Sequence, residues 1–168
     1  AGQLVAPLEL TVPTAAQIAL NIPPWPHPGG PHIDGLTPPE PSGRPGTFTL
    51  LAGLMLTDQP EPDMGNLSVW PGSHRVIAEY LRTHGPDAIM GIPHPPFAFA
   101  PPEQVVGRAG DLLLAHYLLG HNMGGNHAGE TRKVLYFRLH ARGHRARWRE
   151  AVCDPLLEFA PVRAALAN

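Results

Sequence analysis

The sequence contains a single cysteine, Cys153, among its 168 residues. One cysteine excludes both an intrachain disulfide framework and a cysteine-rich zinc site, and it fits a reducing compartment. No apolar run approaches the roughly 20 residues that span a membrane, and the N-terminus lacks the basic-then-apolar layout of a signal peptide. We therefore expect a cytoplasmic protein with no membrane partner.

Charge of either sign is also scarce, since Lys and Arg number 12 and Asp and Glu number 14. The formal net charge is -2, and the basic residues form no run that would favour nucleic acid as a partner. Apolar residues make up 43% of the chain, enough at this length for one domain with a buried core. We expect a single domain over residues 1–168.

Proline and glycine are abundant, with 22 and 18 residues respectively. The prolines cluster in residues 23–45 and 86–102, and the segments between are strongly apolar, which predicts strands joined by long loops and not disorder. The expected strands are 16–22, 47–58, 66–70, 103–107, 111–117 and 132–140. Gly53, inside the second of these, suggests a bulge or a close approach. Helical patterns are confined to about 74–84 and 146–159.

These short strands show no alternation with helices, which favours an antiparallel arrangement over a parallel sheet. The fold class predicted is mainly β: a double-stranded β-helix, or cupin-like jelly roll, with a few flanking helices. The proline-rich loops 35–46 and 85–102 are long enough to be functional, and we expect them to line a substrate pocket.

Ten histidines stand out, and the triplet of His32, Ile33 and Asp34 places an imidazole and a carboxylate two residues apart. Residues two apart in an extended segment point to the same face, so the two side chains can converge on one ion. A third ligand is expected within residues 110–139, where a strand ends at a glycine-rich loop. Two histidines and one carboxylate leave three positions open, as in non-heme Fe(II) oxygenases.

Two further stretches carry a family resemblance. Residues 110–139, GDLLLAHYLLGHNMGGNHAGETRKVLYFRL, and residues 65–74, GNLSVWPGSH, follow the triplet in the chain. In this order they resemble the phytanoyl-CoA dioxygenase family of Fe(II)- and 2-oxoglutarate-dependent oxygenases, in which an arginine follows the last histidine ligand by eleven residues, as Arg132 follows His121. Together the motifs extend over residues 16–139.

The resemblance implies that His32, Asp34 and His121 bind Fe(II) and that Arg132 holds the distal carboxylate of 2-oxoglutarate. A planar guanidinium suits that task, because it can grip a carboxylate with two parallel hydrogen bonds. On the first expected strand, the amides of Gln17 and Asn21 are implied to lie near the cosubstrate.

The implied reaction is hydroxylation of a small organic substrate by O2, with succinate and CO2 as co-products. Because Asp34 is present, hydroxylation is favoured over halogenation, which in relatives frees that ligand position for chloride. Two features depart from the family pattern. Met123 stands where relatives often carry a small hydroxyl residue, and only 31 residues precede His32, so the N-terminal portion of the usual fold is expected to be missing.

Two other functions remain open. A cupin-like metal enzyme that does not use 2-oxoglutarate would need the three ligands but not Arg132, and a non-catalytic jelly-roll binding domain would need none of them. Elsewhere, His116 is expected to be a core or supporting histidine. Ser73 is expected to cap the helix that follows it, and Asn126 to order the loop before Arg132.

Overall fold

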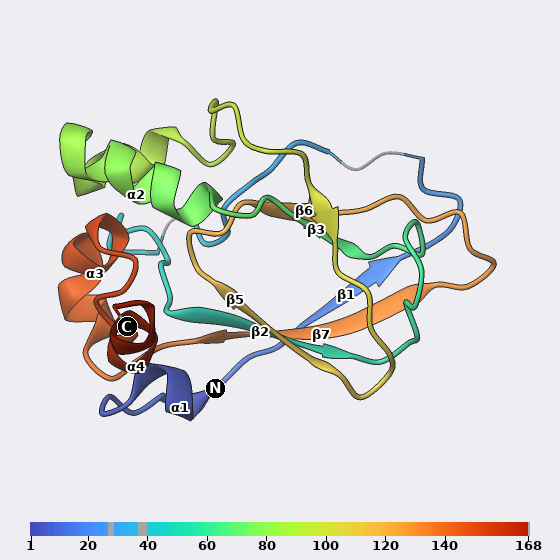
Figure 1. Cartoon of the computed structure of the whole chain (residues 1–168), viewed down its shortest axis with the longest axis horizontal. Coiled ribbons are helices and arrows are strands. Elements are labelled where there is room, and N and C mark those ends of the chain that lie inside the picture. Colours follow the sequence, from blue (N-terminus) through green and yellow to red (C-terminus); the bar gives the residue numbers. More distant parts are fainter. Residues whose placement is uncertain (27–28, 37–39, 168) are drawn as a thin grey trace.

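The computed structural model describes residues 1–26, 29–36 and 40–167. Two antiparallel sheets form the body of the molecule, one of four strands in the order β1-β7-β2-β5 and one of three in the order β4-β3-β6 (Figure 1). The strands are β1 (Gln17–Asn21), β2 (Leu50–Met55), β3 (Leu67–Val69), β4 (Glu103–Gln104), β5 (Leu112–His116), β6 (His121–Met123) and β7 (Arg132–Leu139). This is the predicted mainly-β jelly roll.

Helices gather at one end of the two sheets, on the side where both chain termini lie (Figure 1). They are α1 (Gly2–Val5), α2 (Ser73–His84), the 3-10 helix η1 (Pro86–Gly91), α3 (His144–Cys153) and α4 (Ala160–Leu166). Within the described part of the chain, no helix combines the length and the apolar character needed to cross a bilayer.

The main core joins the sheets to the helices through buried apolar side chains. Phe48, Leu51 and Val134 from the sheet side belong to one cluster with Ile77 of α2 and Trp148 of α3. A second, smaller cluster unites α1 and α4 with the end of β2. The side chains of β1 and β7 that point towards the three-stranded sheet include the polar residues of the candidate site.

Gly53 of β2 allows the close approach that its position in an apolar strand suggested. A Cβ atom there would lie 2.6 Å from Cε1 of Tyr136 on the neighbouring strand β7, a distance that real Cβ atoms do not reach. The glycine therefore makes room for the Tyr136 ring against the sheet.

Several boundaries differ from the sequence predictions. Helices are not confined to the two predicted stretches, because α1, η1 and α4 lie outside them, and α3 ends at Cys153 instead of near residue 159. Both η1 and α4 have a proline in their first turn, a position where proline is compatible with a helix. These prolines made the two segments look like loops in the sequence. Strand β6 was not predicted, since its three residues acquire strand geometry only by pairing with β3.

The predicted cap at Ser73 is wrong. The N-cap residue of α2 is Gly72, which has a positive φ of 81°, and no side chain caps the helix. Instead, the buried Ser73 hydroxyl accepts a hydrogen bond of 2.8 Å from the backbone N–H of Gly120. Its partner is therefore not its own helix but the residue before His121.

Candidate metal centre

His32 and His121 are brought together by a backbone bridge between segments distant in sequence. The N–H of each donates to the carbonyl of the other, at 3.0 and 3.1 Å, so the two residues form an isolated antiparallel pair. Directly opposed residues in such a pair have close side chains, and their ring centroids lie 4.5 Å apart. The bridge explains how one histidine from a loop and one from β6 reach the same point.

Asp34 completes a cluster with both imidazoles. Its Oδ1 lies 3.4 Å from Nε2 of His32 and 3.7 Å from Nε2 of His121. One ligand atom from each residue falls within 4.8 Å of the other two, which is close enough for a single metal ion between them. The structure thus places the three predicted ligands together, while their role as iron ligands remains a prediction.

The tautomer of His121 suits a metal ligand. Its Nδ1 lies 2.9 Å from the carbonyl oxygen of Leu119, and a carbonyl only accepts, so Nδ1 must carry the proton. The lone pair of the neutral ring is then on Nε2, the nitrogen that faces Asp34. A backbone acceptor that fixes the tautomer in this way is the usual second partner of a metal-binding histidine.

Asp34 is held in its ionised form. Burial alone would raise the pKa of its carboxyl, but the adjacent imidazoles of His121 and His32 and the positive charge of Arg138 outweigh this and hold the pKa far below its usual range. Nη2 of Arg138 donates to Oδ2 of Asp34 at 2.7 Å. One carboxylate oxygen is therefore bound by arginine, and the other faces the two histidines.

The three residues open onto a cavity of about 170 Å³ between the sheets. Its walls are Gln17, Ala19, His32, Asp34, Leu51, Leu67, His121, Asn122, Met123, Arg132 and Tyr136. Arg132 is only 3% exposed, and its Nη2 donates to the Tyr136 hydroxyl at 2.7 Å. Burial raises the pKa of Tyr136 although the Arg132 charge opposes this, so the hydroxyl stays neutral and accepts the bond.

The segment Gly65–His74 supports this centre without entering it. Val69 pairs with His121 across β3 and β6, and Ser73 binds the residue before His121. Gly65 has a positive φ of 81°, and a Cβ atom there would lie 2.9 Å from Cβ of Arg132. The GNLSVWPGSH stretch therefore positions the last histidine and leaves room for the arginine.

Gln17 and Asn21 lie on the same face of β1, as predicted, but only Gln17 is among the residues that line this cavity. Asn21 is 1% exposed, pairs in register with Arg132, and donates through Nδ2 to the carbonyl of Gly124. Its Oδ1 is buried without a hydrogen-bond partner among the described residues. Contact of either amide with a cosubstrate stays a prediction.

Three residues at the site were not singled out from the sequence: Tyr136, Arg138 and Asn122. A signal for the first two exists, because side chains on β7 alternate and residues 132, 134, 136 and 138 share one face. Once Arg132 is placed inside the jelly roll, this alternation turns Arg138 towards Asp34. Asn122 gives no comparable signal, since its segment is typical of a loop.

The remaining predictions near the site concern His116 and Asn126. His116 packs between His74 and Phe159, its Nδ1 accepts from the Leu118 N–H, and burial lowers its pKa to about 3, so it is a core histidine as predicted. Asn126 is fully buried, and its amide donates to the carbonyls of Asn21 and Glu130. It orders the loop before Arg132, as expected.

The predicted pocket walls fit less well. None of the described residues of the predicted loops 35–46 and 85–102 lines the cavity beside the ligands. The segment 85–102 still reaches the site, because the carbonyl of Pro93 accepts from the Ile33 N–H and the His94 ring lies 6.4 Å from that of His32. Residues 37–39 of the first loop lie outside the described part of the chain.

Comparison with solved structures identifies the architecture. The chain superposes on the non-heme alpha-ketoglutarate-dependent carbocyclase SnoK from nogalamycin biosynthesis with a TM-score of 0.52 and 24% identity, over 81% of this chain and 50% of SnoK. EctD from S. alaskensis gives a TM-score of 0.52 and 19% identity over 79% of this chain and 45% of EctD. Their jelly-roll fold is the fold of this chain.

AviO1 from Streptomyces viridochromogenes is a further match, with a TM-score of 0.50 and 22% identity over 79% of this chain and 51% of AviO1. The chain therefore spans about half the length of these solved structures. No protein-family model matches the chain, and no curated protein matches it either.

Proposed function

We propose that this chain is the jelly-roll domain of an Fe(II)- and 2-oxoglutarate-dependent oxygenase that hydroxylates a small organic substrate. The observation that carries the proposal is one small cavity whose walls contain both the His32, Asp34 and His121 cluster and the buried Arg132. A fold shared with an alpha-ketoglutarate-dependent enzyme, SnoK, supports it. In this reaction O2 is the co-reactant, and succinate and CO2 are the co-products.

The donor set fits Fe(II). Two neutral imidazole nitrogens and one ionised carboxylate oxygen are ligands that iron accepts, and a set of three leaves room for further ligands. The Leu119 carbonyl fixes the His121 tautomer, and Arg138 fixes the carboxylate of Asp34. These two ligands therefore have the second partners that orient them, as a preformed metal site requires.

The other end of the cavity fits a dicarboxylate. Arg132 is buried and has only neutral partners among the described residues, the Tyr136 hydroxyl at 2.7 Å and the amide oxygen of Gln59 at 3.5 Å. A buried guanidinium without a carboxylate partner is costly, and a bound anion would supply the missing charge. Arg132 would hold the distal carboxylate, with the keto-acid end towards the metal ligands.

When bound, iron with 2-oxoglutarate and O2 supplies the oxidising chemistry, in which decarboxylation of the cosubstrate to succinate is coupled to oxygen insertion into a C–H bond. The chain contributes orientation and shielding. Leu51, Leu67 and Met123 form an apolar wall that limits water near the site. SnoK, a carbocyclase, shares the fold, so hydroxylation is the specific part of the proposal. The carboxylate of Asp34 favours hydroxylation over halogenation, which needs that ligand position for chloride.

Two measurements test the proposal. Anaerobic titration with Fe(II) should show one bound ion per chain, and Fe(II) with 2-oxoglutarate and O2 should yield succinate. His121→Ala should lose both. Arg132→Gln should retain iron but weaken 2-oxoglutarate binding roughly 10- to 100-fold, the loss expected for hydrogen bonds to a charged group.

Lys133→Gln is the matched control for the arginine, because Lys133 is the exposed neighbour on the same strand and points to the opposite face. It should leave 2-oxoglutarate affinity unchanged. Iron binding with no effect of Arg132→Gln would instead indicate a metal enzyme that does not use 2-oxoglutarate. Absence of iron binding would leave the non-catalytic jelly-roll domain.

A further inference from the structure

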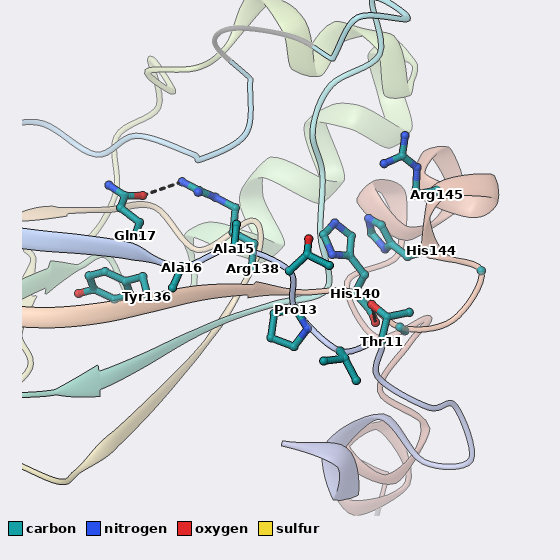
Figure 2. Close-up of a pocket in the computed structure, with 14 residues that line it drawn as sticks. Thr11, Pro13, Ala15, Ala16, Gln17, Tyr136, Arg138, His140, His144 and Arg145 are labelled. Atoms are coloured by element: carbon teal, nitrogen blue, oxygen red, sulfur yellow. Dashed lines mark hydrogen bonds between the residues drawn. The ribbon is translucent and has the colours of Figure 1, made fainter.

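A second and larger cavity, of about 490 Å³, adjoins the first. Its walls come from the segment before β1, residues 11–17, and from the end of β7 through the start of α3 (Figure 2). Gln17 and Tyr136 line both cavities. The larger space therefore shares part of its wall with the cavity that contains the three candidate ligands and Arg132.

The walls of this larger cavity are apolar and basic. Val12, Pro13, Ala15 and Ala16 supply apolar surface on one side, and no Asp or Glu is among its described lining residues. The charged side chains that do line it are Arg138 and Arg145. In Figure 2 the Arg138 side chain reaches Gln17, whereas the Arg145 guanidinium lies at the helical end, away from Arg138.

Arg138 is only partly satisfied by its protein partners. Its Nη2 donates both to Asp34 at 2.7 Å and to the Gln17 amide oxygen at 3.1 Å. Its Nε is buried without a partner among the described residues, but its side chain as a whole is 39% exposed, so the donors left for a ligand are those at the exposed end of the guanidinium. One nitrogen thus carries both contacts, and the guanidinium retains donors for another acceptor.

The positive charge around Arg145 is likewise only partly neutralised. Its Nη2 donates to Oε2 of Glu40 at 2.7 Å, and the same oxygen also binds Arg44. One carboxylate therefore faces two guanidinium groups. Asp34 pairs with Arg138 and is also one of the three residues proposed to bind iron. A bound iron ion would therefore neutralise part of the Asp34 charge and leave Arg138 less fully paired.

We propose that the larger cavity binds the primary substrate and that this substrate is an organic anion. Its apolar body would lie against residues 12–16 and its carboxylate or similar group on Arg138, while the charge of Arg145 at the helical end of the cavity favours an anion from a distance. The assignment rests on the proposed function, since the smaller cavity is then occupied by 2-oxoglutarate. Arg138 contacts both Asp34 and the larger cavity, which would place the anionic end of the substrate beside the proposed metal ligand Asp34.

A matched pair of probes tests the charge requirement on the metal-free protein, so that the result does not depend on turnover. The probes are 2-naphthoate and 2-naphthamide, which share one aromatic body and differ in charge. Isothermal titration should show that the acid binds about tenfold more tightly than the amide, as one charge-assisted contact provides. Equal affinities would overturn the proposal.

Arg138→Gln should abolish the preference for the acid over the amide. Because Arg138 also binds Asp34, thermal melting must show that this variant is folded, and Arg145→Gln provides a second test at a more exposed position. Arg145→Gln should reduce the preference about threefold, as expected for an exposed charge. Unchanged preference in both variants would refute the assignment.

Arg142→Gln is the matched control, because Arg142 belongs to the same segment but pairs with Glu9 away from the cavity. It should keep the full preference. A final measurement relates the site to the metal centre: 2-naphthoate should change the visible spectrum of the anaerobic complex with Fe(II) and 2-oxoglutarate. Binding without a spectral change would overturn the substrate assignment, whereas succinate formation would still stand.

Discussion

Two clusters in this molecule have similar composition and different surroundings. At the candidate metal centre, His32 and His121 face Asp34 across a cavity. At the helical end, His144 lies with its Nδ1 2.9 Å from Oε2 of Glu158 and its Nε2 3.0 Å from the Thr47 hydroxyl. The second cluster is almost fully buried, since the side chains of His144 and Glu158 are 2% and 3% exposed, although His144 is among the residues that line the larger cavity.

The difference shows what separates a ligand set from a structural pair. Both ring nitrogens of His144 have a protein partner, so the ring has no free lone pair directed at a cavity. His121 uses only Nδ1 for a backbone contact and leaves Nε2 facing Asp34 at the cavity. Residue types alone do not separate the clusters; the hydrogen bonds that each histidine already makes do.

The sharpest way to test this comparison is to remove one histidine from each cluster. His121→Ala should lower Fe(II) affinity by at least about 100-fold, because loss even of a partner behind a metal ligand costs roughly 10- to 100-fold. His144→Ala should leave Fe(II) affinity within about twofold, as expected for a distant site. Isothermal titration under anaerobic conditions measures both.

The same two variants should differ in stability in the opposite sense. His144→Ala removes the imidazole partner of the buried Glu158 carboxylate, which then keeps only the Thr49 hydroxyl as a donor, and should lower the free energy of unfolding by about 3–5 kcal/mol. His121→Ala, beside a cavity, should cost much less. Urea unfolding gives both values. Equal losses would contradict the distinction between the buried His144–Glu158 pair and the cavity-lining His121.

The loss of folding stability at acid pH should also depend on the buried cluster of His144 and Glu158. Burial acts to raise the pKa of Glu158, but the hydrogen bond and charge of His144, with the Thr49 hydroxyl and the charge of Arg147, hold it below its ordinary value of 4.5. A lowered pKa in the folded state stabilises the fold above pH 4.5, and this contribution is lost as the pH falls through the folded-state pKa.

Glu158→Gln removes that dependence. The difference in unfolding free energy between wild type and Glu158→Gln should therefore be largest above pH 4.5 and shrink steadily at lower pH. Denaturant titrations at a series of pH values between about 3 and 7 measure it, spanning the ordinary carboxyl range. A difference that is constant with pH would show that Glu158 is not ionised in the folded protein.

A smaller effect is expected at Ser73, which lies behind the candidate metal centre and binds the residue before His121. Ser73→Ala leaves the Gly120 N–H without its acceptor in a buried position and should destabilise the fold by about 1–2 kcal/mol. Because Gly120 precedes His121, Fe(II) affinity should fall as well. Thr83→Ala, on the exposed side of the same helix, is the control, and an effect of equal size there would exclude a specific role for Ser73.

The smallest predicted effect concerns Tyr136, which orients Arg132. Tyr136→Phe removes one neutral acceptor and should weaken 2-oxoglutarate binding by about three- to tenfold, the range of a single hydrogen bond. Fe(II) affinity should not change, because Tyr136 does not touch the three proposed ligands. Cosubstrate and metal titrations of the variant separate the two effects, and a loss of iron would assign Tyr136 to the metal centre instead.

Much of the fold could be predicted because its signals are local. Proline-free apolar segments marked β2, β5 and β7, and the amphipathic segment after Ser73 marked α2. The failures have a common reason. Strand β6 and the 3-10 helix η1 are short and polar or proline-containing, so their geometry comes from partners elsewhere in the chain.

The candidate site divides in the same way. The sequence motifs and their spacing pointed to His32, Asp34, His121 and Arg132, and all four line one cavity. Arg138 was missed, because its contact with Asp34 joins the end of β7 to a loop and forms only when both are in place.

The sequence by itself determined the alternation of buried strands and the placing of His32 and Asp34 on one face, because both depend on residues a few positions apart. His121 and Arg132 were assigned through the family resemblance. Only the tertiary structure decided which histidines have a free nitrogen. His32 and His121 meet through a backbone bridge between distant segments, and His144 is satisfied by Glu158 and Thr47. Whether a histidine nitrogen keeps a free lone pair depends on all of its neighbours in space, and the spacing of residues in the sequence does not reveal those neighbours.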